Sequence, residues 1–190
     1  MVKFTSKKNK GARKMNSLNS NVKKICSFYV NDWHLTVMLL PYIKQEVENQ
    51  KRIITFMEQN LEDNVTILLS KLNLQEDIKK QIKAIKWNTN TNLKYTEIEK
   101  TLKQGKGETT ILVSGKKDYI EKVNKSLEKY EKNNKKQTIK IINCYEVSNF
   151  NKNIKEVLDS HDAILNTGGE RPIEEVFEGY QKEEIKKKTS

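Results

Sequence analysis

The 190-residue chain contains only two cysteines, and no apolar run approaches the ~20 residues that a membrane-spanning helix needs. Two cysteines are too few for a disulfide framework, and both Cys26 and Cys144 lie in apolar runs, so we expect reduced, buried thiols. No apolar segment follows the charged amino terminus, which argues against a signal peptide. These absences predict a cytoplasmic protein without a membrane span.

The chain also has few glycines, and they do not form a phosphate-binding motif. Gly105-Lys106-Gly107 and Ser114-Gly115-Lys116-Lys117 come nearest, but neither has the Gly-x-x-x-x-Gly-Lys-Ser/Thr spacing that wraps a phosphate in backbone amides. The first predicted strand leads into no Gly-x-Gly-x-x-Gly either. A conventional ATPase or dinucleotide enzyme is therefore disfavoured.

Metal ligands and activated nucleophiles are equally sparse. The two histidines, His34 and His161, and the two cysteines are far apart, without Cys-x-x-Cys or His-x-x-x-His spacing. Catalysis by either cysteine would require an exposed thiolate beside a base, and their apolar neighbours disfavour this. We expect no metal site, no cofactor and no catalytic residue.

Positive charge is abundant but unevenly placed. The formal net charge is +11, and residues 1–24 hold eight basic residues and no acidic one, which leaves about +3 for the rest of the chain. A segment of this composition is expected to be a disordered tail. It is either a solubilising tail or a weak, salt-dependent contact to nucleic acid or to an anionic membrane surface. The candidate contact residues are Lys7, Lys8, Lys10, Arg13 and Lys14.

Apolar periodicity beyond the tail predicts strands that alternate with amphipathic helices. Alternation of this kind predicts an α/β fold of three layers, in which helices cover both faces of a mostly parallel sheet of about 5–6 strands. We assign this domain to 25–170 and a charged helix or tail to 171–190, with the helix over 173–188. The expected strands are 25–30, 51–57, 84–87, 109–114, 137–144 and 163–165, and the main helices are 61–72, 75–83, 95–104, 118–131 and 150–159.

Two similar segments near the ends of the domain locate a candidate site. In each, a short apolar run with a cysteine and a tyrosine leads through a polar turn into a helix, and ligands of α/β proteins bind at the carboxyl ends of such strands. Aromatic residues with a polar tip suit a small-molecule pocket, although core packing explains any one of them equally well, and a helix-end role suits the second histidine. The candidate ligand-binding residues are Tyr29, Trp33, His34, Tyr145 and His161.

The same two segments resemble the methanogen/methylotroph sensory (MEDS) domain family. The first match runs from Cys26-Ser27-Phe28-Tyr29 through Pro41-Tyr42-Ile43 to Lys51-Arg52-Ile53-Ile54, and the second comprises Ile142–Glu146 and Ser160–Asn166. The resemblance implies a RecA-like sensory domain without a working nucleotide site, of a kind thought to sense small hydrocarbon derivatives. Such domains are often joined to a DNA-binding or kinase module, and neither is present in this sequence. Lys116 and Asp162 also depart from the family pattern.

The sequence therefore predicts a non-enzymatic, MEDS-type sensory domain. It would bind an unknown small molecule at the carboxyl ends of the strands around Tyr29 and Tyr145 and signal through a separate regulatory protein. One alternative is a nucleic-acid-associated protein that acts through its basic tail, and it predicts strongly salt-dependent binding. The other is a degenerate nucleotide hydrolase, and the missing phosphate loop weighs against it.

Overall fold

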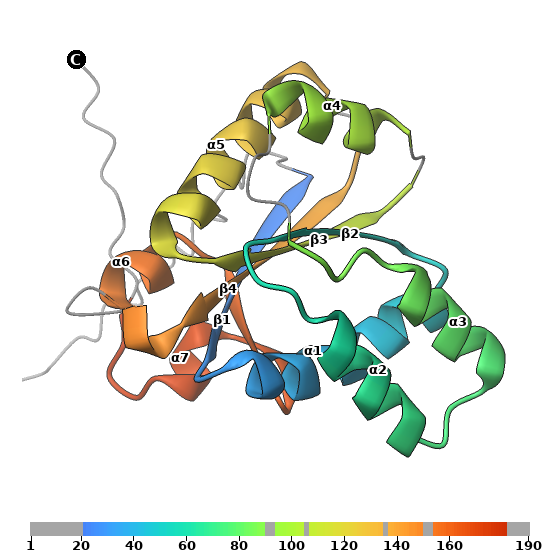
Figure 1. Cartoon of the computed structure of the whole chain (residues 1–190). Coiled ribbons are helices and arrows are strands. Elements are labelled where there is room, and N and C mark those ends of the chain that lie inside the picture. Colours follow the sequence, from blue (N-terminus) through green and yellow to red (C-terminus); the bar gives the residue numbers. More distant parts are fainter. Residues whose placement is uncertain (1–20, 90–93, 105–106, 135–136, 150–153, 182–190) are drawn as a thin grey trace, which may run out of the picture.

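The computed structural model describes residues 21–89, 94–104, 107–134, 137–149 and 154–181. Six strands form one sheet in the order β2-β3-β4-β1-β5-β6, and the first five strands in this order run parallel (Figure 1). β6 pairs antiparallel with β5 and closes one edge. The strands are β1 (Val22–Tyr29), β2 (Arg52–Met57), β3 (Thr109–Gly115), β4 (Ile139–Glu146), β5 (Ala163–Asn166) and β6 (Gly169–Arg171).

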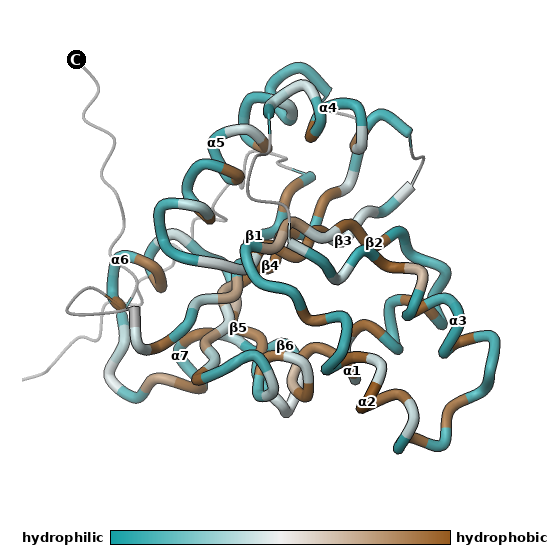
Figure 2. Tube along the Cα trace, in the orientation of Figure 1, coloured by the Kyte–Doolittle hydropathy of each residue, from teal (hydrophilic) through white to brown (hydrophobic). Residues whose placement is uncertain are grey.

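Helices cover both faces of the sheet, because alternate side chains of each strand point to opposite faces. One core lies under α1 (Asp32–Glu48), α2 (Glu62–Lys71) and α3 (Glu76–Ala84). The other lies under α4 (Tyr95–Lys103), α5 (Lys117–Asn133), α6 (Ile154–Asp159) and α7 (Ile173–Val176). Figure 2 shows hydrophobic residues concentrated along the strands, whereas α5 is mostly hydrophilic with short hydrophobic segments. The predicted three-layer α/β fold, with helices on both faces of a mostly parallel sheet, is confirmed.

Two predicted elements are wrong. The segment 84–87 is not a strand, because Ala84 still belongs to α3 and the following residues close that helix. The Trp87 indole donates to the carbonyl of Ile82 at 2.8 Å, and the Trp87 carbonyl accepts the amide of Leu61 at 2.8 Å. Its burial therefore reflects a helix-end contact and not pairing within the sheet.

The predicted helix over 173–188 is also wrong over the part that the structure describes. α7 ends at Val176, and residues 177–181 are not helical. Only Ile173 is buried among the α7 residues, and Val176, Phe177 and Tyr180 are partly buried and pack against the same core. A helix of four residues is marginal on its own, so these contacts with the core hold α7 in place.

The strand β1 begins at Val22, three residues before the predicted start of the domain. Val22 pairs in register with Ile139 of β4, and the carbonyl of Asn21 accepts the amide of Ile139 at 2.7 Å. Lys23 and Lys24, which the sequence assigns to the basic tail, therefore belong to the sheet. The remaining tail candidates, from Lys7 to Lys14, lie outside the described residues. Among the described residues, no helix is long and apolar enough to cross a membrane.

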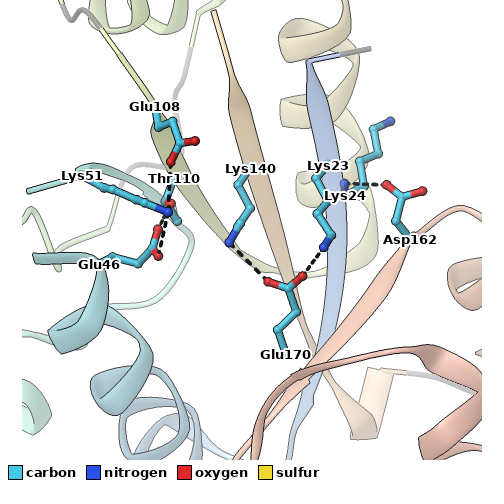
Figure 3. A network of polar contacts seen from close by, with 9 residues as sticks. All are labelled: Lys23, Lys24, Glu46, Lys51, Glu108, Thr110, Lys140, Asp162 and Glu170. Atoms are coloured by element: carbon cyan, nitrogen blue, oxygen red, sulfur yellow. Dashed lines mark hydrogen bonds and ion pairs between the residues drawn. The ribbon is translucent and has the colours of Figure 1, made fainter. Parts of the chain in front are cut away.

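Charged side chains tie the elements together at the amino ends of the parallel strands (Figure 3). Glu170 of β6 forms ion pairs with Lys23 of β1 and with Lys140 of β4, whose Nζ lies 3.3 Å from Glu170 Oε2. Lys23 and Lys140 are register partners on neighbouring strands. One carboxylate therefore offsets the repulsion between two adjacent ammonium groups and holds the β5–β6 hairpin against the sheet.

A second polar cluster at this end joins α1 to β3. Glu46 is only 4% exposed and accepts a hydrogen bond from Thr110 Oγ1 at 2.5 Å. Lys51 Nζ lies 3.5 Å from Glu46 Oε1 and 3.0 Å from Glu108 Oε2 (Figure 3). A buried carboxylate is tolerated only when it is paired and hydrogen-bonded, and Glu46 meets both conditions.

Candidate functional site

The carboxyl ends of the strands form an open, acidic crevice with a volume of about 440 Å³. It lies where the turns that follow β1, β2, β3 and β4 meet, which is the edge at which ligands usually bind in α/β folds. Of the five predicted site residues, only Tyr29 lines it. The polar lining residues include Asp32, Glu58, Gln59, Lys116 and Glu146.

The backbone amides of this crevice are largely committed to the protein's own side chains. Lys116 N donates to Glu58 Oε2 at 2.6 Å, and His34 N donates to Asn31 Oδ1 at 2.8 Å. Phosphate binding in nucleotide sites requires free amides at such turns, together with positive charge. Burial, and then the charge of Glu146, raises the pKa of Asp32, and neither condition favours a bound anion. The crevice does not have the chemistry of a phosphate site.

A second pocket, which we call the α5–α6 pocket, lies on the face of the sheet between α5 and α6 and has a volume of about 340 Å³. Asn143 and Tyr145 of β4 reach it from the sheet, together with Lys24 of β1. Glu121, Asn124, Lys125 and Glu128 line it from α5, where the 3.6-residue period places them on one face. Val157, Ser160 and His161 line it from α6 and the turn that follows.

Asn143 lies at the floor of this pocket and is fully buried. Its Nδ2 lies 2.9 Å from Nε2 of His161, a residue that is only 2% exposed. The Oδ1 of Asn143 is buried and has no hydrogen-bond partner among the described residues. A buried acceptor without a partner costs about 1–3 kcal/mol, so this atom is a specific reason to expect something in the pocket.

The hydrogen bonds of His161 assign the orientation of the Asn143 amide. His161 Nδ1 lies 2.5 Å from the carbonyl oxygen of Val157, which can only accept, so Nδ1 carries the proton. In the neutral ring Nε2 is then an acceptor, and the group that faces it must be the amide nitrogen of Asn143. The oxygen of the amide therefore faces away from His161 and remains unpaired.

Asn124 contributes a second acceptor of the same kind from the opposite wall. Its Oδ1 is buried without a partner among the described residues, although the side chain as a whole is only partly buried. Ion pairs occupy the mouth of the pocket around it. Lys24 Nζ lies 2.7 Å from Glu128 Oε1, and Lys117 Nζ lies 3.3 Å from Glu156 Oε2. These contacts join the strand, α5 and α6 around the opening.

Tyr145 forms the aromatic part of the α5–α6 pocket. Its ring stacks on Phe28 with centroids 6.0 Å apart and meets His161 edge to face at 5.9 Å. Burial raises the pKa of the Tyr145 hydroxyl above its ordinary value, so the group stays protonated at neutral pH. The site therefore combines an aromatic face with uncharged polar atoms.

The five predicted site residues do not form one pocket. Tyr145 and His161 lie together in the α5–α6 pocket, and His161 makes the predicted helix-end contact to Val157. Tyr29 packs in the core on the opposite face of the sheet, where its hydroxyl accepts from Gln59 Nε2 at 3.0 Å. His34 Nδ1 accepts the amide of Val30 at 3.2 Å within the start of α1.

Trp33 lies apart from both pockets on the surface of α1. It is 41% exposed, and Lys71 Nζ is 6.0 Å from its ring centroid. A tryptophan in the first turn of α1 thus contacts the last residue of α2 rather than a ligand pocket. In the sequence Trp33 stands close to the carboxyl end of β1, because α1 begins at Asp32, and this proximity made it a candidate site residue.

Both cysteines are free thiols and fully buried. Burial raises the pKa of Cys26 to about 12, and burial likewise raises the pKa of Cys144. Cys26 packs in the core beneath α5 and α6, whereas Cys144 packs in the core beneath α1. Within the described part of the chain, no group of three or more His, Cys, Asp or Glu side chains is placed to hold a metal ion.

The two asparagines are the site residues that the sequence analysis missed. Asn143 interrupts an otherwise apolar run from Ile141 to Tyr145, and an amide in the middle of a buried strand is a signal that could have identified it. Asn124 stands beside Val123 at the edge of the apolar stripe of α5 and gives no such signal.

No family model and no curated protein sequence matches the chain. Among solved structures, the chain is similar to one described as an ATPase domain, with 8% sequence identity and a TM-score of 0.48. The match covers 76% of this chain and 69% of that one. A likeness this distant carries no argument about activity.

Proposed function

We propose that this chain is a non-enzymatic binding protein for a small molecule, and that the α5–α6 pocket holds the ligand. The observation that carries the proposal is the buried Oδ1 of Asn143, which His161 orients and which no described residue satisfies. Ligand sites are concave, partly apolar and carry a few placed polar groups. Tyr145, Asn143 and Asn124 supply that combination.

The same hydrogen bonds argue for binding rather than catalysis. A general base needs a nitrogen or oxygen free to take a proton from the substrate. In His161, Nδ1 is committed to the carbonyl of Val157 and Nε2 to the amide of Asn143. The histidine positions the amide and has no ring nitrogen left for proton transfer.

A sensory role follows if occupancy of the pocket is read by another protein. The resemblance to MEDS domains supplies this part of the proposal, with a separate signalling or regulatory protein as the output partner. α6 is a suitable reporter because it is short, lines the pocket through Val157 and packs against the sheet through Leu158. A ligand that displaces or orders α6 would change the surface presented to that partner.

Native mass spectrometry of the full-length protein, purified gently from its own host, tests the binding role. We expect a stoichiometric small-molecule adduct. The adduct should be depleted in Asn124→Ala and retained in Asn133→Ala, which makes the same change at an exposed position of α5 outside the pocket. A clean mass of the unliganded chain, or an adduct insensitive to Asn124→Ala, would overturn the proposal.

A further inference from the structure

Two side chains that line the α5–α6 pocket, Asn124 and Asn143, each bury an oxygen that has no hydrogen-bond partner among the described residues, and both oxygens are acceptors. We infer that the ligand of this pocket is a molecule that directs N–H or O–H donors at the pocket floor and carries no carboxylate or phosphate there. This inference rests on the proposed binding role and names the chemical class of the ligand. Three features of the pocket support it.

The first feature is the fixed direction of the Asn143 amide. Rotating this amide by half a turn would place its oxygen against His161 Nε2, which in the neutral ring bears no proton when Nδ1 donates to Val157. Two acceptors would then face each other at 2.9 Å. The amide therefore cannot turn its nitrogen toward the ligand and donate a hydrogen bond to an anion. The atom that Asn143 presents at the floor of the pocket remains its oxygen, which is an acceptor.

The second feature is the repetition of this polarity on the α5 wall. Asn124 Oδ1 is also buried and without a partner among the described residues. Two carbonyl-type oxygens from different elements thus line one cavity, and neither has a donor from the described part of the protein. A ligand with donor groups satisfies both, whereas an anionic ligand would place further acceptors against them.

The third feature is the state of the lysines. Lys24 is paired with Glu128, and Lys117 is paired with Glu156. The lining holds three lysines and three glutamates, so it has no excess of positive charge. An anion would have to break an ion pair to reach Lys24 or Lys117, and it would still leave the floor unsatisfied.

Water is the simplest donor that could satisfy these oxygens, but the dimensions of the pocket favour a larger guest. A single water has a share of liquid volume of about 30 Å³, and the pocket has about 340 Å³. The cavity also carries the aromatic ring of Tyr145 on one side. An organic molecule with N–H or O–H groups can donate to Asn124 Oδ1 and Asn143 Oδ1 and at the same time cover the ring of Tyr145.

Three probes of nearly identical shape test the donor requirement. Acetamide has donors and an acceptor, acetamidinium has donors only, and acetate has acceptors only. The readout is the set of side-chain amide resonances of Asn124 and Asn143 in the ¹⁵N-labelled full-length protein, with Asn133 as the control outside the pocket. We expect acetamide and acetamidinium to shift both pocket resonances, and acetate at the same concentration to leave them unchanged.

Asn124→Ala supplies the matched variant. Loss of one neutral hydrogen bond should weaken acetamide binding by about 3- to 10-fold. In this variant the binding is measured from the side-chain amide resonance of Asn143. Asn133→Ala should leave that binding unchanged. Shifts from acetate equal to those from acetamide, or no shift from any probe, would overturn the inferred ligand class. A host-derived adduct together with acetate-selective shifts would support the binding role and contradict only the donor requirement. Absence of the adduct and of any probe shift would contradict the binding role and the donor requirement together.

Discussion

Lys140 of β4 and Glu170 of β6 form an ion pair that joins the parallel body of the sheet to its antiparallel edge, with Lys140 Nζ 3.3 Å from Glu170 Oε2. Glu170 also pairs with Lys23, the register partner of Lys140 on β1. The β5–β6 hairpin is short, and few other polar contacts of described residues hold β6. The stability of this edge should therefore depend on the charge of one carboxylate.

The first prediction concerns that carboxylate. Burial alone would raise the pKa of Glu170, but the hydrogen bond from Lys23 and the charges of Lys140 and Lys23 outweigh it, and the net pKa is lowered below 4.5. The pairing thus stabilises the protein above pH 4.5, and this stabilisation is lost as pH falls through the lower folded-state pKa. Glu170→Gln should lower the free energy of unfolding at pH 7 by roughly 1 kcal/mol.

Urea denaturation at pH 7 and at acid pH measures this effect. The difference between Glu170→Gln and the unmodified protein should shrink as the pH falls below 4.5, because the unmodified protein then also loses the charge. Glu178→Gln, at an exposed position, serves as the control and should match the unmodified protein. A difference that stays constant across this pH range would contradict the assignment.

The second prediction concerns Asn124 in the unliganded protein. Asn124→Ala removes a buried acceptor without a partner among the described residues and places a better helix former inside α5, so it should raise the free energy of unfolding by about 1 kcal/mol. Thermal and urea unfolding of ligand-free protein measure it. A purely structural asparagine would give the opposite sign, so destabilisation by Asn124→Ala would contradict the proposed role.

The third prediction concerns the cysteines. Cys26 and Cys144 are fully buried, and a thiol with a pKa of about 12, such as Cys26, is ionised in only roughly one molecule in ten thousand at pH 8. Both should therefore resist alkylation in the folded protein and react at the rate of global unfolding. Thiol titration with and without guanidinium chloride checks this. Rapid modification of either cysteine under native conditions would show local opening of the sheet.

The sequence predicted the strands of the central sheet well, because β1, β3 and β4 are apolar runs bounded by turn residues. It failed at 84–87, where the same apolar signal came from a tryptophan that ends a helix. It did not predict β6, because Gly169–Arg171 has only 3 residues and no apolar side chain. In the structure Gly168 N donates to Asn166 Oδ1 at 2.8 Å, and Gly169 adopts a φ of 96°, which turns the chain back along β5.

The candidate site was only partly predictable, because it depends on strand register. Tyr29 and Tyr145 both end apolar runs and look equivalent in sequence. The register, however, pairs Tyr145 with Phe28, so Tyr29 is one position further along β1 and points to the other face. No single-sequence pattern fixes that register. Asn143 stands out in the sequence as an amide within a buried strand, but only the structure shows that its oxygen has no partner among the described residues.

The fourth prediction concerns Gly115, at the end of β3 beside the acidic crevice. A Cβ atom there would lie 2.7 Å from Glu58 Cβ and 2.9 Å from Tyr119 Cδ1, so the turn after β3 would have to move. Gly115→Ala should lower the free energy of unfolding by about 1–3 kcal/mol. Gly168→Ala is the control for thermal unfolding, because the closest atom to its Cβ would be Asn166 Oδ1 at 3.2 Å. Equal melting temperatures for the two variants would contradict this packing.

The last prediction tests the pairing of Asn143 with His161, on which the orientation of the pocket floor depends. Asn143→Ala removes the partner of His161 Nε2, and His161→Ala removes the partner of Asn143 Nδ2, whereas the carbonyl of Val157 still accepts from Ser160. Each single change should therefore destabilise the protein by about 2–4 kcal/mol, from lost packing and an unpaired buried group.

The double variant should cost about 1–3 kcal/mol less than the sum of the two single changes, because the penalty for an unpaired partner is then counted only once. Urea denaturation of the four proteins measures this coupling energy. In His161→Ala the amide of Asn143 is also free to rotate, so its side-chain resonance should respond to acetate as well as to acetamide. Additive free energies together with unchanged selectivity between the two probes would show that His161 does not orient Asn143.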